Sequence, residues 1–118
     1  MGLVQTNSAT GASGTSTSTD KQICAQSNTS GAVVYTVPAG KKFVGFASHE
    51  RANWSSGYYA EIISASGGIA RHTGGFSNMG GGTYPMGDSP ELTLLAGTSV
   101  KNQGGSNYCC VMGIESDA

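Results

Sequence analysis

The chain has 118 residues, a formal net charge of −1 and only 11% charged residues, whereas 19 of its residues are glycine. This length suits one domain with a modest core. The lack of a basic excess argues against nucleic acid as a partner, because such proteins need Lys and Arg to replace phosphate counterions. No apolar run approaches the roughly 20 residues of a membrane-spanning helix, so no membrane is expected as a partner either.

Residues 1–20 are predicted to form an N-terminal arm that precedes a β-domain over residues 21–118. Gly, Ser, Thr, Asn and Ala dominate the arm, and after Met1 its sizeable apolar side chains are Leu3 and Val4. Such a segment cannot bury enough surface to offset its ordering entropy. We expect it to order only against a neighbour, with Leu3 and Val4 docking it. The residues after Met1 lack the apolar region of a signal peptide, so we expect synthesis in a cytoplasm.

Two runs of β-branched and aromatic residues, Val33–Val37 and Lys41–His49, flank the turn sequence Pro38-Ala39-Gly40. Pro presets φ early in a turn and Gly accepts a positive φ, so the stretch predicts strand, sharp turn, strand. The sequence from Glu91 to Val100 repeats this pattern around Ala96-Gly97. In the run 41–49 both faces carry apolar groups, which predicts a strand covered on both sides.

The polar stretch 50–57 holds the single tryptophan, Trp54, and the strand predicted over 58–66 begins with Tyr58 and Tyr59. Trp54 is either a contact anchor or a side chain that folds back over the core. These three aromatic residues are therefore the candidate contact anchors. A further strand is predicted over 69–73, with Gly67-Gly68 as a two-residue hairpin loop.

The glycine-rich stretch 74–82 is predicted to be a surface loop, and Tyr84-Pro85-Met86 an edge strand, because Pro cannot donate to a sheet. Strands over 92–95, 98–101 and 107–115 complete the domain. No stretch has helical periodicity, so the chain should be an all-β sandwich or barrel. The predicted core residues are Phe43, Phe46, Leu92, Leu94, Val111 and Ile114.

Titratable and nucleophilic residues form no convincing site. Cys109 and Cys110 point to opposite faces of one strand, so with Cys24 they are expected to be three free thiols. No C-x-x-C pair occurs, and His49 and His72 are isolated, so neither a metal nor another cofactor is expected. The cluster His49-Glu50-Arg51 also divides between two strand faces. No catalytic residue is assigned, and the chain is not expected to be an enzyme.

The stretch 35–42, followed by 92–100 and 111–115, resembles small β-sandwich proteins of tailed-bacteriophage virions, most of all capsid decoration (cement) proteins. The resemblance covers roughly residues 33–48 and 91–115. It implies a jelly-roll-like antiparallel β-sandwich with an extended N-terminal arm. It also implies a structural role on the outer surface of a phage capsid, with the major capsid protein as partner and a homotrimer or other homo-oligomer as the assembled form.

Under that resemblance the protein belongs to the virion surface and stabilises the capsid by bridging capsomers. A receptor- or carbohydrate-binding module of a tail fibre or tail tip is the alternative. An adhesin should gather aromatic residues in one loop cluster, and Trp54, Tyr58 and Tyr59 come closest to that pattern.

Overall fold

The computed structural model describes residues 19–51, 59–72, 75–77, 84–86, 90–103 and 107–118. Every regular element in these ranges is a β-strand. The strands are β1 (Lys21–Ser27), β2 (Val33–Thr36), β3 (Lys41–Arg51), β4 (Tyr59–Ile63), β5 (Ile69–His72), β6 (Gly75–Ser77), β7 (Tyr84–Met86), β8 (Leu92–Leu95), β9 (Ser99–Gln103) and β10 (Cys109–Asp117).

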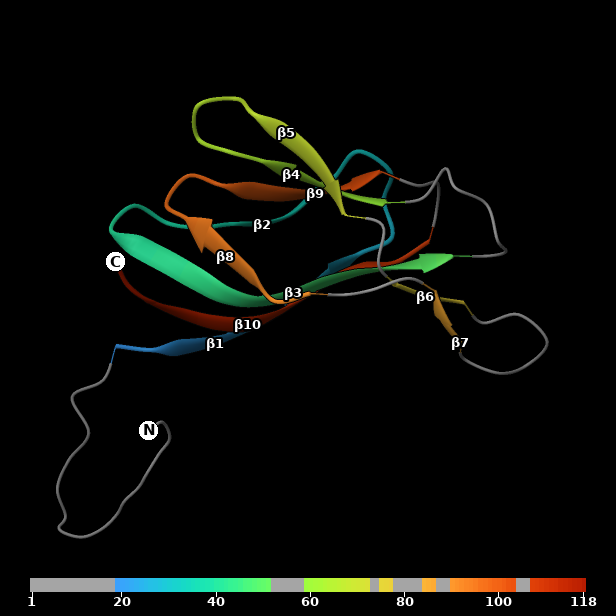
Figure 1. Ribbon diagram of the computed structural model, residues 1–118, viewed down its shortest axis with the longest axis horizontal. Helices are drawn as coiled ribbons and strands as arrows, with labels where there is room; N and C mark the ends of the chain where they lie inside the picture. Colours follow the sequence, from blue (N-terminus) through green and yellow to red (C-terminus); the bar gives the residue numbers. More distant parts are fainter. Residues whose placement is uncertain (1–18, 52–58, 73–74, 78–83, 87–89, 104–106) are drawn as a thin grey trace, which may run out of the picture.

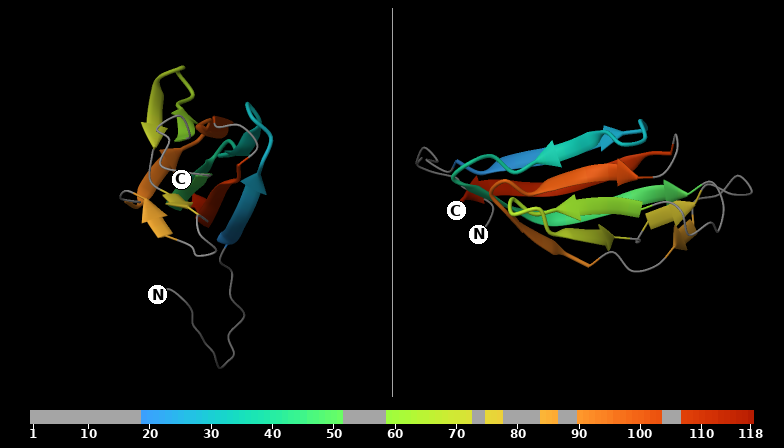
Figure 2. Two further views of the ribbon diagram at one scale, coloured as in Figure 1. Left: turned by 90° about the vertical axis from the view of Figure 1, so that its right-hand side faces the viewer. Right: turned by 90° about the horizontal axis from the view of Figure 1, so that it is seen from above.

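The strands form two stacked sheets (Figure 1). One, here the β1 sheet, contains β1-β10-β3 with β8 paired to the far edge of β3, and the other, the β2 sheet, has the order β2-β9-β4-β5. These eight strands pair antiparallel throughout, in the order of a jelly roll. Seen from above, the strands of both layers lie along roughly the same axis, with arrows that point both ways (Figure 2). The predicted jelly-roll-like β-sandwich is therefore confirmed.

A short hairpin of β6 and β7 extends the β1 sheet beyond the jelly roll. β6 pairs parallel with the end of β3, from His49 to Arg51, and antiparallel with β7. The prediction that 74–82 is entirely a surface loop was wrong, because Gly75–Ser77 joins the sheet. Tyr84–Met86 is an edge strand, as its proline predicted.

The two sharp turns found in the sequence carry the chain between the sheets. β2 and β3 belong to different sheets, as do β8 and β9, so neither turn closes a hairpin. Gly40 and Gly97 have φ of 76° and 84°, which favours glycine at both places. The turns also bond to each other: Val37 N–H donates to Thr98 O at 2.9 Å, and Gly97 N–H donates to Val37 O at 2.9 Å. The two similar stretches therefore lie side by side and are hydrogen-bonded to each other at one corner of the sandwich.

The hydrophobic core lies between the sheets. Its buried side chains are Ile23, Val37, Phe43, Ala47, Ala60, Leu94, Val100, Cys109 and Val111, with Leu92 partly buried against them. Phe43, Leu94 and Val111 thus occupy the predicted core. Phe46 and Ile114 do not: they are 43% and 44% exposed, because they lie on the face of the β1 sheet that no other element among the described residues covers.

Phe43 fills a space that two glycines leave open. Gly45 and Gly113 are paired across β3 and β10. A Cβ built on either would lie 2.7 Å from Phe43 Cζ and closer still to backbone atoms of the other strand. The ring of Tyr35 packs against Phe43 with 5.2 Å between centroids. The Phe43 ring, packed against the backbone of the paired glycines Gly45 and Gly113, therefore forms the centre of the core.

Candidate interaction surface

The face of the β1 sheet that points away from the β2 sheet is called the outer face here. Side chains alternate between the two faces along each strand, and residues paired across neighbouring strands share a face. These two rules identify the residues of the outer face. They are Gln22, Cys24 and Gln26 on β1; Lys42, Val44, Phe46, Ser48 and Glu50 on β3; Thr93 and Leu95 on β8; and Cys110, Met112, Ile114 and Ser116 on β10.

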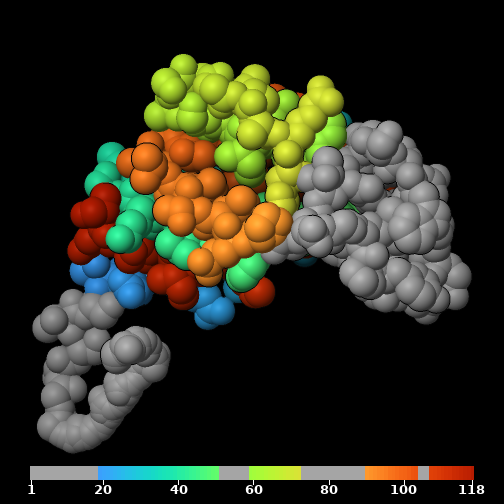
Figure 3. Space-filling view, viewed as in Figure 1, coloured from blue at the N-terminus to red at the C-terminus, as the bar shows by residue number. Residues whose placement is uncertain are grey.

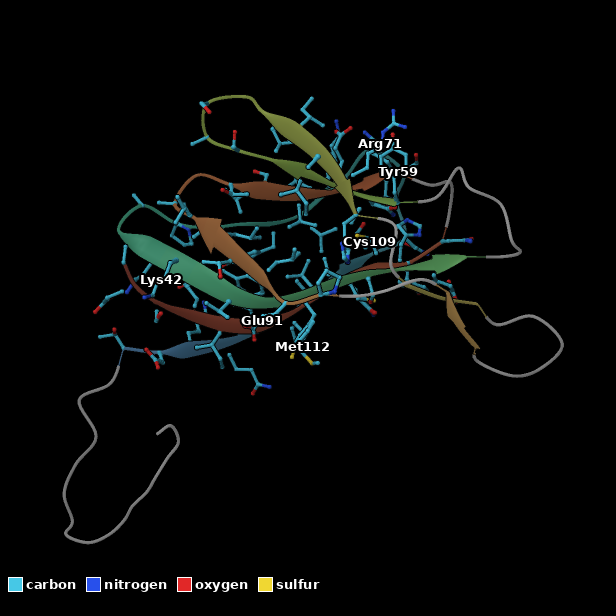
Figure 4. The ribbon with its side chains drawn as sticks, in the orientation of Figure 1. Lys42, Tyr59, Arg71, Glu91, Cys109 and Met112 are labelled. Atoms are coloured by element: carbon cyan, nitrogen blue, oxygen red, sulfur yellow. The ribbon has the colours of Figure 1, made fainter. Side chains whose placement is uncertain are left out.

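The centre of the outer face is apolar. Phe46, Met112 and Cys24 are paired in one row across three strands, and Val44 and Ile114 are paired in the next. Met112 is 56% exposed and projects away from the β2 sheet (Figure 4). An antiparallel sheet with one solvated face normally alternates apolar inside with polar outside, but β3 and β10 carry apolar side chains on both faces. A contiguous exposed apolar patch of this kind indicates an interaction surface.

The patch has a hollow at its middle. Phe46, Met112, Val44 and Ile114 surround a depression of about 360 Å³, and the backbone of the Gly45–Gly113 pair contributes to its lining. The depression is shallow and open to solvent. An apolar side chain from a partner could enter it.

Three charged residues of the described chain lie on or beside the outer face. Lys42 lies at one end of β3 and Glu50 near the other, with Phe46 midway between them in sequence. Glu50 Oε1 accepts a hydrogen bond from Tyr108 N–H at 3.3 Å. Glu91 borders the hollow. The other outward positions of β1, β3 and β10 hold no carboxylate, ammonium, guanidinium or imidazole group.

All three cysteines are free, as predicted. Cys24 is exposed on the outer face, and Cys110, which shares that face, is half-buried with its Sγ 3.9 Å from Gln26 Oε1. Burial raises the pKa of Cys110, and nearby Glu50 raises it further. Cys109 points into the core, where burial raises the pKa of its thiol to about 12. Neither Cys109 nor Cys110 is therefore held as a reactive thiolate.

A buried polar cluster joins the two sheets near the end of β3. His49 Nε2 lies 2.6 Å from Asn102 Oδ1, and His49 Nδ1 lies 2.8 Å from the carbonyl oxygen of Glu50. Asn102 Nδ2 donates to the carbonyl oxygens of Ser27 and Asn107 at 3.1 and 3.0 Å. Cys109 is paired with His49 on the same inner face.

Cysteine, histidine and asparagine together also occur in some hydrolytic sites, where the thiol must meet a substrate. Here all three side chains are fully buried, with no exposed surface on any of them. The hydrogen bonds of Asn102 instead tie β9 to β3, to the last residue of β1 and to the segment before β10. This arrangement supports a structural role, in which one amide satisfies two backbone carbonyls.

The predicted contact anchors do not meet at one place that the structure describes. Trp54 and Tyr58, like Leu3 and Val4 of the arm, lie outside the described residues. Tyr59 is half-buried on β4, in the β2 sheet, and the Arg71 guanidinium carbon stands 4.7 Å from the centroid of its ring (Figure 4). That cation–π pair belongs to the opposite layer from the outer face.

A second groove opens at the side of the sandwich, between the tip of the β4–β5 hairpin and the β8–β9 corner. It has a volume of about 440 Å³ and mixes apolar walls with hydroxyl groups. Ser64 Oγ, one of these hydroxyls, is within 3.1 Å of Ser66 Oγ and accepts from Gly68 N–H at 2.9 Å. In Figure 3 the β8–β9 segment, in orange, lies exposed below this hairpin. The local hydroxyl bonds close the hairpin tip, which is longer than the predicted two-residue loop.

Within the described residues, no group of three or more His, Cys, Asp or Glu side chains is placed to hold a metal ion. The described part of the chain also contains no helix long and apolar enough to cross a membrane.

Sequence reasoning assigned Phe46 and Ile114 to the core and so missed the outer face. The signal was present: Tyr108, Cys110, Met112 and Ile114 alternate with Cys109, Val111, Gly113 and Glu115, and neither set is polar throughout. The chain matches no protein-family model, no curated protein and no solved structure in comparisons with known proteins.

Proposed function

We propose that the protein is a structural virion component that binds the outer surface of a phage capsid and stabilises it by bridging capsomers. The observation that carries the proposal is the apolar, nearly uncharged outer face of the β1 sheet. A sheet with apolar groups on both faces is an inner layer, so its exposed side is suited to being covered in an assembly. The proposed partner is the major capsid protein, with the decoration subunits themselves forming a homotrimer or other homo-oligomer.

The attachment of the N-terminal arm supports this proposal. The arm leads into β1, which pairs with β10 alone among the described strands. Thr19 Oγ1 donates to Asp117 Oδ2 at 2.7 Å, and Lys41 Nζ lies 2.6 Å from Asp117 Oδ1. The point at which the arm leaves the sandwich is therefore fixed beside an open sheet edge. From there an extended segment can reach a neighbouring subunit and add to its sheet.

The alternative is a receptor- or carbohydrate-binding module of a tail fibre or tail tip. The side groove with its serine and threonine hydroxyls favours this reading, since sugar sites combine apolar walls with a few polar groups. Jelly rolls serve in both capsids and lectins, so the fold itself does not choose between the two.

Capsid binding tests the proposal directly. The full chain, titrated onto expanded capsids that lack it, should saturate at a fixed stoichiometry, whereas an adhesin should bind host cells or their polysaccharide without capsids. Deletion of residues 2–18 should lower capsid occupancy sharply and leave the melting temperature of the free protein nearly unchanged, because Thr19 and its hydrogen bond are retained. The double change Leu3→Asp and Val4→Asp should reproduce much of the loss. Undiminished binding by the truncated protein would assign the arm no role.

A further inference from the structure

We propose that the outer face of the β1 sheet pairs with the same face of a second copy of this chain, with the two β3 strands antiparallel. The inference rests on the proposed function only in that both treat the outer face as an assembly surface. It adds the identity of the occupant and the symmetry of the contact. Four arguments lead to it: area, composition, charge and register.

The area suits a second copy. Four strands about 4.8 Å apart and seven residues long present roughly 500 Å² of sheet, so two copies would bury on the order of 1,000 Å². This lies at the lower limit for a specific interface, and we expect a dissociation constant in the micromolar range. Two sheets pack face to face in this way in any β-sandwich, at a spacing of about 10 Å.

The composition favours a copy of the same face over other occupants. Residues 1–18 offer Met1, Leu3 and Val4 as sizeable apolar side chains, too few to cover an apolar patch that spans three strands. An anionic membrane or a nucleic acid would need cationic groups, and the centre of the patch carries none. A second outer face offers the apolar side chains of Phe46 and Met112 as partners for the same residues of the first copy.

The marginal charges select the orientation. Lys42 and Glu50 stand at opposite ends of the outer face, each four residues from Phe46. If the two β3 strands ran parallel across the interface, Lys42 would approach Lys42 and Glu50 would approach Glu50. If they run antiparallel, each Lys42 approaches a Glu50 of the other copy. Opposite charges at both ends therefore favour the antiparallel pairing.

The register then follows from symmetry. A two-fold axis that exchanges Lys42 and Glu50 must cross β3 at Phe46, midway between them. Phe46 is in register with Met112, and Met112 is in register with Cys24. The axis therefore runs along this row, and each of the three residues faces its own counterpart. An interface of this kind is isologous and closes as a dimer.

Sedimentation of the full chain over a range of concentrations tests the pairing. Wild-type protein should pass from monomer to dimer in the micromolar range, and Phe46→Glu should weaken the dimer by at least about tenfold, because it buries two charges at the axis. Ile69→Glu is the matched control: Ile69 is 64% exposed on β5 in the other sheet, and its replacement should leave dimerisation unchanged. Circular dichroism should show that both variants remain folded.

A charge exchange tests the orientation. Lys42→Glu and Glu50→Lys should each weaken the homodimer, since each places like charges at both ends. An equimolar mixture of the two variants should recover dimers, because every contact then joins opposite charges. Weakening of each single variant relative to the wild type is specific to the antiparallel arrangement, because in a parallel pairing the wild-type protein would already have like charges at both ends.

Cysteine cross-linking tests the axis. Two sheets about 10 Å apart are too distant for a direct Cys24–Cys24 disulfide, which needs Cα atoms within about 7 Å. A short bis-maleimide should instead link the dimer through Cys24, and Cys24→Ser should abolish the product.

Wild-type protein that stays monomeric into the millimolar range would overturn the pairing. Dimers indifferent to Phe46→Glu would overturn it as well, and dimers of Lys42→Glu or Glu50→Lys as stable as those of the wild type would overturn the antiparallel register. The capsid assay separates this inference from the proposed function. If Phe46→Glu is monomeric but still decorates capsids, the self-pairing stands, the capsid is bound by another surface, and the outer face no longer supports the proposed function. If wild-type protein is monomeric but its capsid binding requires Phe46, the capsid is the occupant and only the self-pairing fails.

Discussion

Replacement of Phe43 by Ala should cause the largest loss of stability among single core truncations. Phe43 is fully buried, its ring contacts Tyr35, and it rests on the Gly45–Gly113 pair. Truncation of a buried Phe costs about 3–5 kcal/mol, a sum of lost transfer free energy and the cavity that remains. Two glycines have no side chains that can relax into the space, so we expect the upper half of this range, about 4–5 kcal/mol.

Urea unfolding followed by circular dichroism measures this cost, with Phe46→Ala as the control. Phe46 belongs to the same strand but is 43% exposed and leaves no enclosed cavity, so its truncation should cost only about 1 kcal/mol in dilute, monomeric protein. A loss of 4 kcal/mol should also lower the melting temperature of a domain of this size by about 16 °C or more. Equal costs for the two truncations would refute the assignment of Phe43 to the inside and Phe46 to the outside.

Three further predictions concern polar groups. Asn102→Leu should destabilise the fold by at least about 2 kcal/mol, because it leaves two buried carbonyls and His49 without their amide, and urea unfolding should show the loss. In native protein Cys24 should react with a thiol reagent and Cys109 should react only after unfolding, as timed mass spectrometry can establish. The hydrogen bond from Lys41, assisted by that from Thr19, lowers the pKa of Asp117 below its ordinary value of 3.8. Because the folded pKa lies below the unfolded one, the stabilisation is present above pH 3.8 and is lost as the pH falls through the folded value. The free energy of unfolding should therefore differ between wild type and Asp117→Asn above pH 3.8, and the difference should disappear once the pH is below the folded pKa of Asp117.

Much of the architecture could be predicted from local patterns. Alternation and turn residues placed most of the strands, and the Pro38-Ala39-Gly40 turn has the positive-φ glycine that its sequence requires. The pairing of strands could not be predicted in this way. β1 lies beside β10, and β2 beside β9, through contacts between distant parts of the chain. Local chemistry indicates that a corner is sharp but not which sheet the chain enters after it.

The candidate site was harder to predict because burial is a property of the whole sheet. Phe43 and Phe46 are equally apolar, and nothing in the sequence of β3 tells which of the two faces solvent. The answer depends on β2 and β9, whose sheet covers only one side of the β1 sheet. The sequence indicated that both faces of β3 carry apolar groups, which is correct. Among the described residues, however, no element packs against the outer face. A prediction that treats every apolar residue of a strand as buried therefore cannot identify an exposed apolar face of this kind.

The position of β10 has a consequence for synthesis of the protein on the ribosome. β10 lies between β1 and β3, yet it is made after all nine other described strands. Until it emerges, β1 and β3 both present unpaired edges, and Phe43 has no Gly113 backbone beneath its ring. Nascent chains should therefore remain open to pairing with one another until translation has passed β10, which is the hazard that unpaired strand edges create. Slow, late closure of this sheet should make the yield of native protein depend on chaperones and on the rate of synthesis.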